Sequence, residues 1–134
     1  MTNEKVLVVD DEIHIVHVVS IKLRNRGFEV ISADNGAEAY HLACEEMPDL
    51  IITDFQMPVM TGLEFLEKLR GNMETAAIPV IMLTARSHAV SPEQRETLRI
   101  HSCLSKPFSP RELLSKVEDI LFQVQVSTGH LNEA

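Results

Sequence analysis

The chain has 134 residues, of which 45% are hydrophobic and 24% charged, as in ordinary globular domains. This length suits one domain with a substantial core and is too short for two. The formal net charge of −8 would repel a nucleic acid backbone, so direct nucleic acid binding is not expected. The sequence contains no apolar run of about 20 residues and no signal-peptide pattern. We therefore expect a cytoplasmic protein without membrane contact.

Five short apolar segments, most of them rich in β-branched residues, predict buried strands. They are residues 5–9, 28–31, 50–53, 80–83 and 102–104. Helix starts are indicated between the strands and after the last one, where a small polar residue precedes Glu or Gln by three positions, as in a capping box. These pairs are Asn35 with Glu38, Thr61 with Glu64, Ser91 with Gln94, and Ser109 with Glu112. The alternation predicts a doubly wound α/β fold around a parallel sheet.

Three of the predicted helices differ in their apolar pattern. Apolar side chains cover more than one stripe of the first helix, residues 13–23, which leaves open either a broad core face or a docking surface for a partner helix. The helix at 91–99 has Leu98 as almost its only apolar residue, so we expect it to pack loosely. The last helix has one apolar face from Leu113 to Val124. After about residue 124 the pattern lapses into a short tail that we expect to fray.

Polar residues follow four of the predicted strands. Asp10 and Asp11 follow the first strand, Asp54 the third, Thr84 the fourth and Lys106 the fifth. Because parallel strands end at one edge of a sheet, these side chains should gather around one crevice. Their convergence there argues against the simpler reading that the three aspartates only cap helices or turns.

The gathered residues predict a phosphoryl-transfer site. Three neighbouring carboxylates repel one another unless a cation or protons are present, and Mg²⁺ prefers such oxygen ligands. The hydroxyl of Thr84 and the ammonium of Lys106 are donors suited to phosphoryl oxygens. An aspartate carboxylate can then attack phosphorus to form an aspartyl phosphate, while the metal ion and the lysine neutralise the developing charge.

The site residues belong to four short motifs in a fixed order. The motifs are Asp10-Asp11-Glu12, Asp54-Phe55-Gln56-Met57-Pro58 with Gly62 following, Leu83-Thr84-Ala85, and Lys106-Pro107-Phe108. Together they are specific, and residues 4–122 resemble the CheY-like receiver domains of response regulators in bacterial two-component signalling. Residues 123–134 are then a short C-terminal tail without an effector domain. The resemblance implies a flavodoxin-like (βα)5 fold whose parallel five-stranded sheet has the order 2-1-3-4-5.

The resemblance also implies how Mg²⁺ is held. Asp10 and Asp11 would be the acidic pair serving the ion, and Asp54 and the backbone carbonyl of Gln56 would be further ligands. The side chains of Gln56 and Arg86 lie two residues beyond Asp54 and Thr84, from where they would tune the lifetime of the phosphoryl group. Pairing of Arg86 with an acid across the pocket is the open alternative.

The remaining roles concern the phosphoryl group itself. By the resemblance, Asp54 would be phosphorylated, Lys106 would bind the phosphoryl oxygens, and Thr84 would be the switch hydroxyl that moves toward them. The chain departs from the family at Cys103, where an aromatic switch residue is usual. We therefore expect the signal to pass through backbone movement or a smaller side chain.

The expected function is that of a stand-alone response regulator receiver. It would accept a phosphoryl group from a histidine kinase or phosphotransfer protein and signal by contact with a downstream protein, as a monomer or weak dimer. It would not be an enzyme, apart from weak self-phosphorylation and self-dephosphorylation. The main alternative is a pseudo-receiver that works without phosphorylation. A phosphohydrolase of the haloacid-dehalogenase type is disfavoured, because that chemistry needs a second Asp where this chain has Gln56.

Overall fold

The strands form one parallel sheet, as the alternating pattern predicts. The computed structural model describes residues 4–85 and 90–133, and the side chains as far as residue 122. The strands are β1 (Lys5–Val9), β2 (Glu29–Ala33), β3 (Leu50–Asp54), β4 (Val80–Thr84) and β5 (Ser102–Ser105). Their order in the sheet is β2-β1-β3-β4-β5, and all the pairs are parallel. The predicted flavodoxin-like order 2-1-3-4-5 is therefore confirmed.

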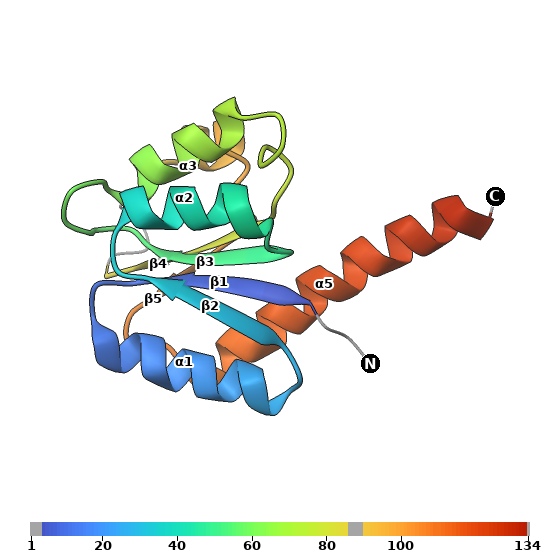
Figure 1. The fold of residues 1–134 in the computed structure, drawn as a ribbon, viewed down its shortest axis with the longest axis horizontal. Coiled ribbons are helices and arrows are strands. Elements are labelled where there is room, and N and C mark those ends of the chain that lie inside the picture. Colours follow the sequence, from blue (N-terminus) through green and yellow to red (C-terminus); the bar gives the residue numbers. More distant parts are fainter. Residues whose placement is uncertain (1–3, 86–89, 134) are drawn as a thin grey trace.

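Helices cover both faces of the sheet (Figure 1). They are α1 (Ile13–Asn25), α2 (Gly36–Glu46), α3 (Gly62–Gly71), α4 (Pro92–Thr97) and α5 (Pro110–Glu133). Alternate strand residues point to opposite faces. Val6 and Val8 accordingly pack with α1 and α5, and Leu7 and Val9 pack with α2 and α3. This double cover explains why β1, β3 and β4 are apolar on both faces.

The predicted helix starts are confirmed by side-chain hydrogen bonds. Reciprocal capping boxes begin α3, between Thr61 and Glu64, and α4, between Ser91 and Gln94. At α2 only one half of the box forms, because Asn35 accepts from the backbone N–H of Glu38. These bonds satisfy backbone donors that the first turn of a helix leaves without a partner.

The C-terminal helix is longer than its apolar pattern predicts. The backbone of α5 remains helical as far as Glu133, and its end extends away from the sheet in Figure 1. Residues 125–133 contain one glycine and no proline. Once a helix is formed, each further residue adds a hydrogen bond at little cost, so helical backbone can extend past the packed face. The segment after residue 124, which was expected to fray, therefore continues the helix in this structure.

The C-terminal end of α4 is held by a cation as well as by the apolar packing of Leu98 and Ile100. No residue of α4 itself is buried, which confirms its few apolar anchors. Arg70 on α3 donates from Nε to the carbonyl oxygen of Leu98 at 2.7 Å and from Nη2 to that of Arg99 at 3.1 Å. Its Nη1 donates to the carbonyl oxygens of Ala76 and Ile78. One guanidinium thus ties α3 to the loop before β4 and to the turn after α4, and burial lowers the pKa of Arg70 to about 10.

Candidate functional site

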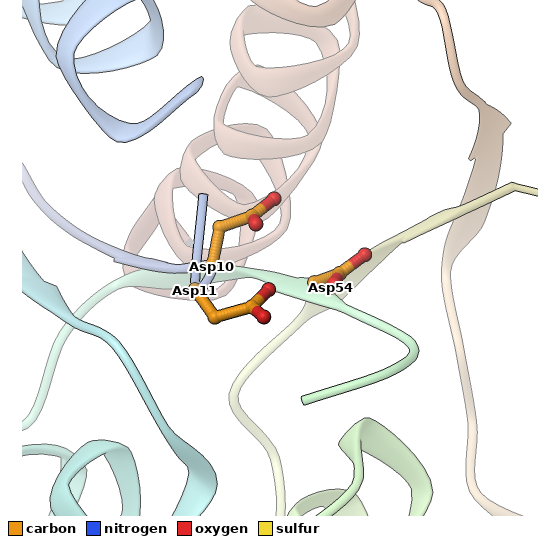
Figure 2. A group of neighbouring side chains, drawn as sticks. All are labelled: Asp10, Asp11 and Asp54. Carbon is orange, nitrogen blue, oxygen red and sulfur yellow. The ribbon is translucent and has the colours of Figure 1, made fainter. Parts of the chain in front are cut away.

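The predicted site residues meet at the carboxyl edge of the sheet. Asp10 follows β1 directly, while Asp54 and Thr84 are the last residues of β3 and β4. Figure 2 shows the side chains of Asp10, Asp11 and Asp54 gathered at this edge, and one carboxylate oxygen from each lies within 4.8 Å of the others. Asp10 and Asp54 are buried and Asp11 is exposed. The sheet therefore brings together the carboxylates that the sequence motifs predict.

Among the residues that the structure describes, Lys106 is the cation that pairs with these acids. Its Nζ lies 3.0 Å from Oδ2 of Asp10 and 3.1 Å from Oδ1 of Asp54. A third partner is Glu12, whose Oε1 is 3.0 Å from the same nitrogen. Sequence reasoning quoted Glu12 within the first motif and gave it no role. The signal available there was its position directly after two acids at a strand end.

Burial and mutual repulsion shift the acidity of the buried carboxyls. Burial, together with the charge of Asp10, raises the pKa of Asp54 to about 6, although Lys106 pulls in the other direction. Burial likewise raises the pKa of Asp10, opposed by hydrogen bonds from the Glu12 N–H and from Lys106. Burial lowers the pKa of Lys106, but its hydrogen bonds to the three carboxylates outweigh this and leave it raised. The site thus carries excess negative charge.

The donor set fits a hard divalent cation. Lys106 is paired with three carboxylates at once, and the exposed carboxylate of Asp11 adds a further negative charge beside them. Mg²⁺ takes oxygen ligands and keeps several waters, so it needs only one or two carboxylates from the protein. Among the described residues, these aspartates are the group of possible metal ligands. Among the same described residues, His14 and His17 do not join such a group.

The structure says less about the three other predicted positions, Thr84, Gln56 and Arg86. Thr84 is buried, and its carbonyl oxygen accepts the backbone N–H of Lys106 at 2.7 Å. This bond fixes the start of the β5–α5 loop against the end of β4. Gln56 is exposed on the loop after β3, so its carbonyl remains a predicted ligand, and Arg86 lies outside the described residues.

Gly62 allows α3 to begin close to the end of β3. Its N–H donates to the carbonyl oxygen of Phe55 at 2.9 Å. A Cβ at this position would lie 2.3 Å from the carbonyl oxygen of Asp54, which is closer than real atoms approach. The glycine of the second motif is therefore required by packing beside the site.

The position of the usual switch aromatic is occupied by a partly buried thiol. Cys103 on β5 pairs in register with Met82 and packs against the cluster beneath α2 and α3. Burial raises the pKa of the Cys103 thiol, while Arg95 lowers it. The departure seen in the sequence therefore lies on the face of the sheet opposite α1.

A comparison of the sequence with models of known protein families shows which family the chain belongs to. The model for the response regulator receiver domain matches residues 6–118. The chain belongs to the response regulator receiver family. The Lys106–Pro107 peptide bond of this receiver is cis. No helix among the described residues is long and apolar enough to cross a membrane.

Curated relatives of this receiver are regulators about twice its length. It is 33% identical to the phosphate regulon transcriptional regulatory protein PhoB of Pseudomonas aeruginosa, over 90% of this chain and 53% of the relative. It is 37% identical to the alkaline phosphatase synthesis transcriptional regulatory protein PhoP of Bacillus subtilis, over 93% and 51%. The chain thus spans about half the length of the curated relatives it matches.

Solved structures of response regulators have the same fold over nearly the whole of their own chains. The chemotaxis response regulator CheY4 of Vibrio cholerae has 37% identity and a TM-score of 0.82, covering 89% of this chain and 99% of that one. The receiver domain of the Francisella response regulator 1452 has 32% identity and a TM-score of 0.81, with 92% and 99% covered.

Proposed function

We propose that this receiver accepts one phosphoryl group on Asp54, from a histidine kinase or phosphotransfer protein, with Mg²⁺ bound at Asp10 and Asp11. The observation that carries the proposal is the placement of Asp54. Its side chain is 9% exposed, 3.1 Å from the ammonium of Lys106 and beside two further carboxylates. A carboxylate in such surroundings can act as a nucleophile toward phosphorus when cations offset the developing charge.

Asp54 and Lys106 have different roles in phosphoryl transfer. A carboxylate oxygen of Asp54 forms the bond to phosphorus as the bond to the donor breaks and the donor leaves with the electron pair. Lys106, held by Asp10, directs its charge at the transferred oxygens. Bound Mg²⁺ would offset the charge of the carboxylates and phosphoryl oxygens, with the carbonyl of Gln56 as a further ligand.

Output would follow from Thr84 and the elements beside it. We assign Thr84 the role of the switch hydroxyl because it is the last residue of β4, the strand that pairs with β3. Without an aromatic at Cys103, the change would pass through the backbone to α4, which has no buried residue and so has few contacts to break. The downstream protein would recognise this altered face.

The donor protein would dock on α1. Ile13, Val18 and Ile21 are exposed apolar residues of this helix, and a groove of about 460 Å³ runs between α1 and the loop that carries Lys106 and Phe108. Exposed apolar surface beside a reactive group is typical of a protein interaction site. This favours the docking interpretation of the apolar excess on α1. The proposal also includes a cytoplasmic location and a monomeric or weakly dimeric state. It includes no enzymatic role beyond weak self-phosphorylation and self-dephosphorylation.

Treatment with Mg²⁺ and acetyl phosphate, followed by intact mass spectrometry, tests the proposal. The wild type should gain one phosphoryl group, and Asp54→Asn should gain none. Asp49→Asn makes the same substitution just before the other end of β3 and should be phosphorylated normally. EDTA should prevent the gain. A folded wild type that gains nothing would favour the pseudo-receiver alternative.

A further inference from the structure

The ammonium group of Lys106 has no donor to spare. A lysine ammonium carries three N–H donors, and three carboxylates lie within reach of this one. Asp10 and Glu12 are each 3.0 Å away, and Asp54 is 3.1 Å away. In the unphosphorylated receiver, a phosphoryl oxygen can therefore gain a Lys106 donor only if one of these acceptors gives it up.

We propose that Glu12 is the acceptor that releases Lys106 when a phosphoryl group is present. Glu12 therefore competes with the phosphoryl group for Lys106. The inference rests on the proposed function, because it concerns the phosphoryl group on Asp54. The Glu12–Lys106 ion pair is exchanged for a pair between Lys106 and the phosphoryl oxygens. Glu12 is thus a positioning residue that sets how tightly the receiver holds a phosphoryl group.

Burial decides which of the three pairs is exchanged. The side chain of Asp10 is 0% exposed, and its Oδ1 also accepts the backbone N–H of Glu12 at 2.9 Å. Removing Lys106 from Asp10 would leave a buried charge without its cation, which is strongly unfavourable. The side chain of Glu12 is 47% exposed, so water can replace the lysine at small cost. Asp54 itself carries the phosphoryl group, and the oxygen that it keeps as a carbonyl remains an acceptor for Lys106.

The position of Glu12 at the start of α1 supports this role. As the N-cap residue of α1, Glu12 makes no side-chain cap hydrogen bond, so its carboxylate is not held by the helix. It lines the same groove as Ile15 and Phe108, and its Oε2 lies 3.7 Å from Nε2 of His14. Release from Lys106 therefore moves a negative charge within the groove beside α1, the helix on which Ile13 and Val18 are exposed.

Binding of beryllium trifluoride tests the inference, because this anion takes the place of a phosphoryl group on a carboxylate. Affinity is measured by ¹⁹F NMR titration at saturating Mg²⁺ for the wild type, Glu12→Ala and Glu12→Gln. Glu12→Ala should bind about two- to fivefold more tightly, which is the size of one half-exposed ion pair. Glu12→Gln should gain less, since its amide oxygen still accepts one neutral hydrogen bond from Lys106.

A matched control separates competition for Lys106 from a general loss of negative charge. Asp34 directly follows β2 at the same edge of the sheet, and its carboxylate is bonded to Asn35 rather than to Lys106. Asp34→Asn should bind like the wild type. A merely structural role for Glu12 would lower affinity on substitution, whereas removal of a competitor raises it.

The outcomes separate the inference from the function on which it rests. Wild-type binding with equal or weaker binding by Glu12→Ala would overturn the competition alone. An equal gain in Asp34→Asn would also overturn it, because the cause would then be charge in general. If neither the wild type nor Glu12→Ala binds the anion, the proposed function fails and the inference fails with it.

Discussion

Substitution of Asp54 by Asn should stabilise the folded receiver in the absence of divalent metal. The side chain of Asp54 is 9% exposed, and it lies beside the carboxylates of Asp10 and Asp11. Burial and these neighbours raise its pKa from 3.8 to about 6, even with Lys106 opposing them. At neutral pH the folded chain therefore contains an unfavourable ionised group, and the amide of Asn has nearly the same shape without the charge.

The size of the effect follows from the acidity. Each tenfold change in acidity corresponds to about 1.4 kcal/mol, so the raised pKa of Asp54 corresponds to about 3 kcal/mol of lost stability when the group is ionised. Above about pH 6 both the folded and the unfolded chain are ionised here, and the penalty is complete. Between about pH 6 and pH 4 the folded state takes up a proton before the unfolded state does. The penalty therefore fades on acidification, and Asp54→Asn should lose its advantage below about pH 4.

Urea denaturation of both chains in EDTA, at pH 7.5 and at pH 4.5, measures this difference. Titrating groups far from the site act equally in both chains, so they cancel in the comparison. Asp11→Asn is the control, because this carboxylate is exposed at the same edge and its removal should gain less. Equal or lower stability of Asp54→Asn at pH 7.5, or an advantage that is unchanged at pH 4.5, would refute the reasoning.

Three further variants test packing and docking. Gly62→Ala should cost about 1–3 kcal/mol of unfolding free energy, because its Cβ would lie 2.3 Å from a backbone oxygen of β3, whereas Gly71→Ala meets nothing within 4 Å and should be neutral. Arg70→Met should cost about 2–4 kcal/mol, because it leaves four carbonyl oxygens without their donor. Both are measured by urea denaturation. Joint replacement of the exposed Val18 and Ile21 by Ser should slow phosphotransfer from the cognate donor protein about tenfold and leave acetyl phosphate labelling unchanged.

Each of these expectations has an outcome that contradicts it. If Gly62→Ala and Gly71→Ala are equally stable, the close approach at β3 does not constrain the chain. If Arg70→Met unfolds like the wild type, the guanidinium is not what holds the turn after α4. Phe122→Ser is the control for docking, since Phe122 is exposed on α5. Equal slowing by this variant would mean that docking is not specific to α1.

The sequence by itself determined the architecture and the acidic centre. Strands covered on both faces read as continuous apolar runs, and capping pairs mark the helix starts, so local patterns carry both signals. Because parallel strands end at one edge, the position of Asp10, Asp11 and Asp54 after strands was enough to predict that they meet. The grouping of these carboxylates was therefore predictable before any distance was known.

Only the tertiary structure decided which groups share Lys106 and what holds α4. Glu12 reaches Lys106 across 94 positions of sequence, and Arg70 reaches carbonyl oxygens 28 and 29 positions away. Side-chain contacts of this kind leave no periodic trace, because they depend on the exact approach of loops rather than on a repeating face. The continuation of α5 to Glu133 was missed for a related reason. An apolar pattern reports packing against the sheet, and backbone hydrogen bonds can continue where that packing ends.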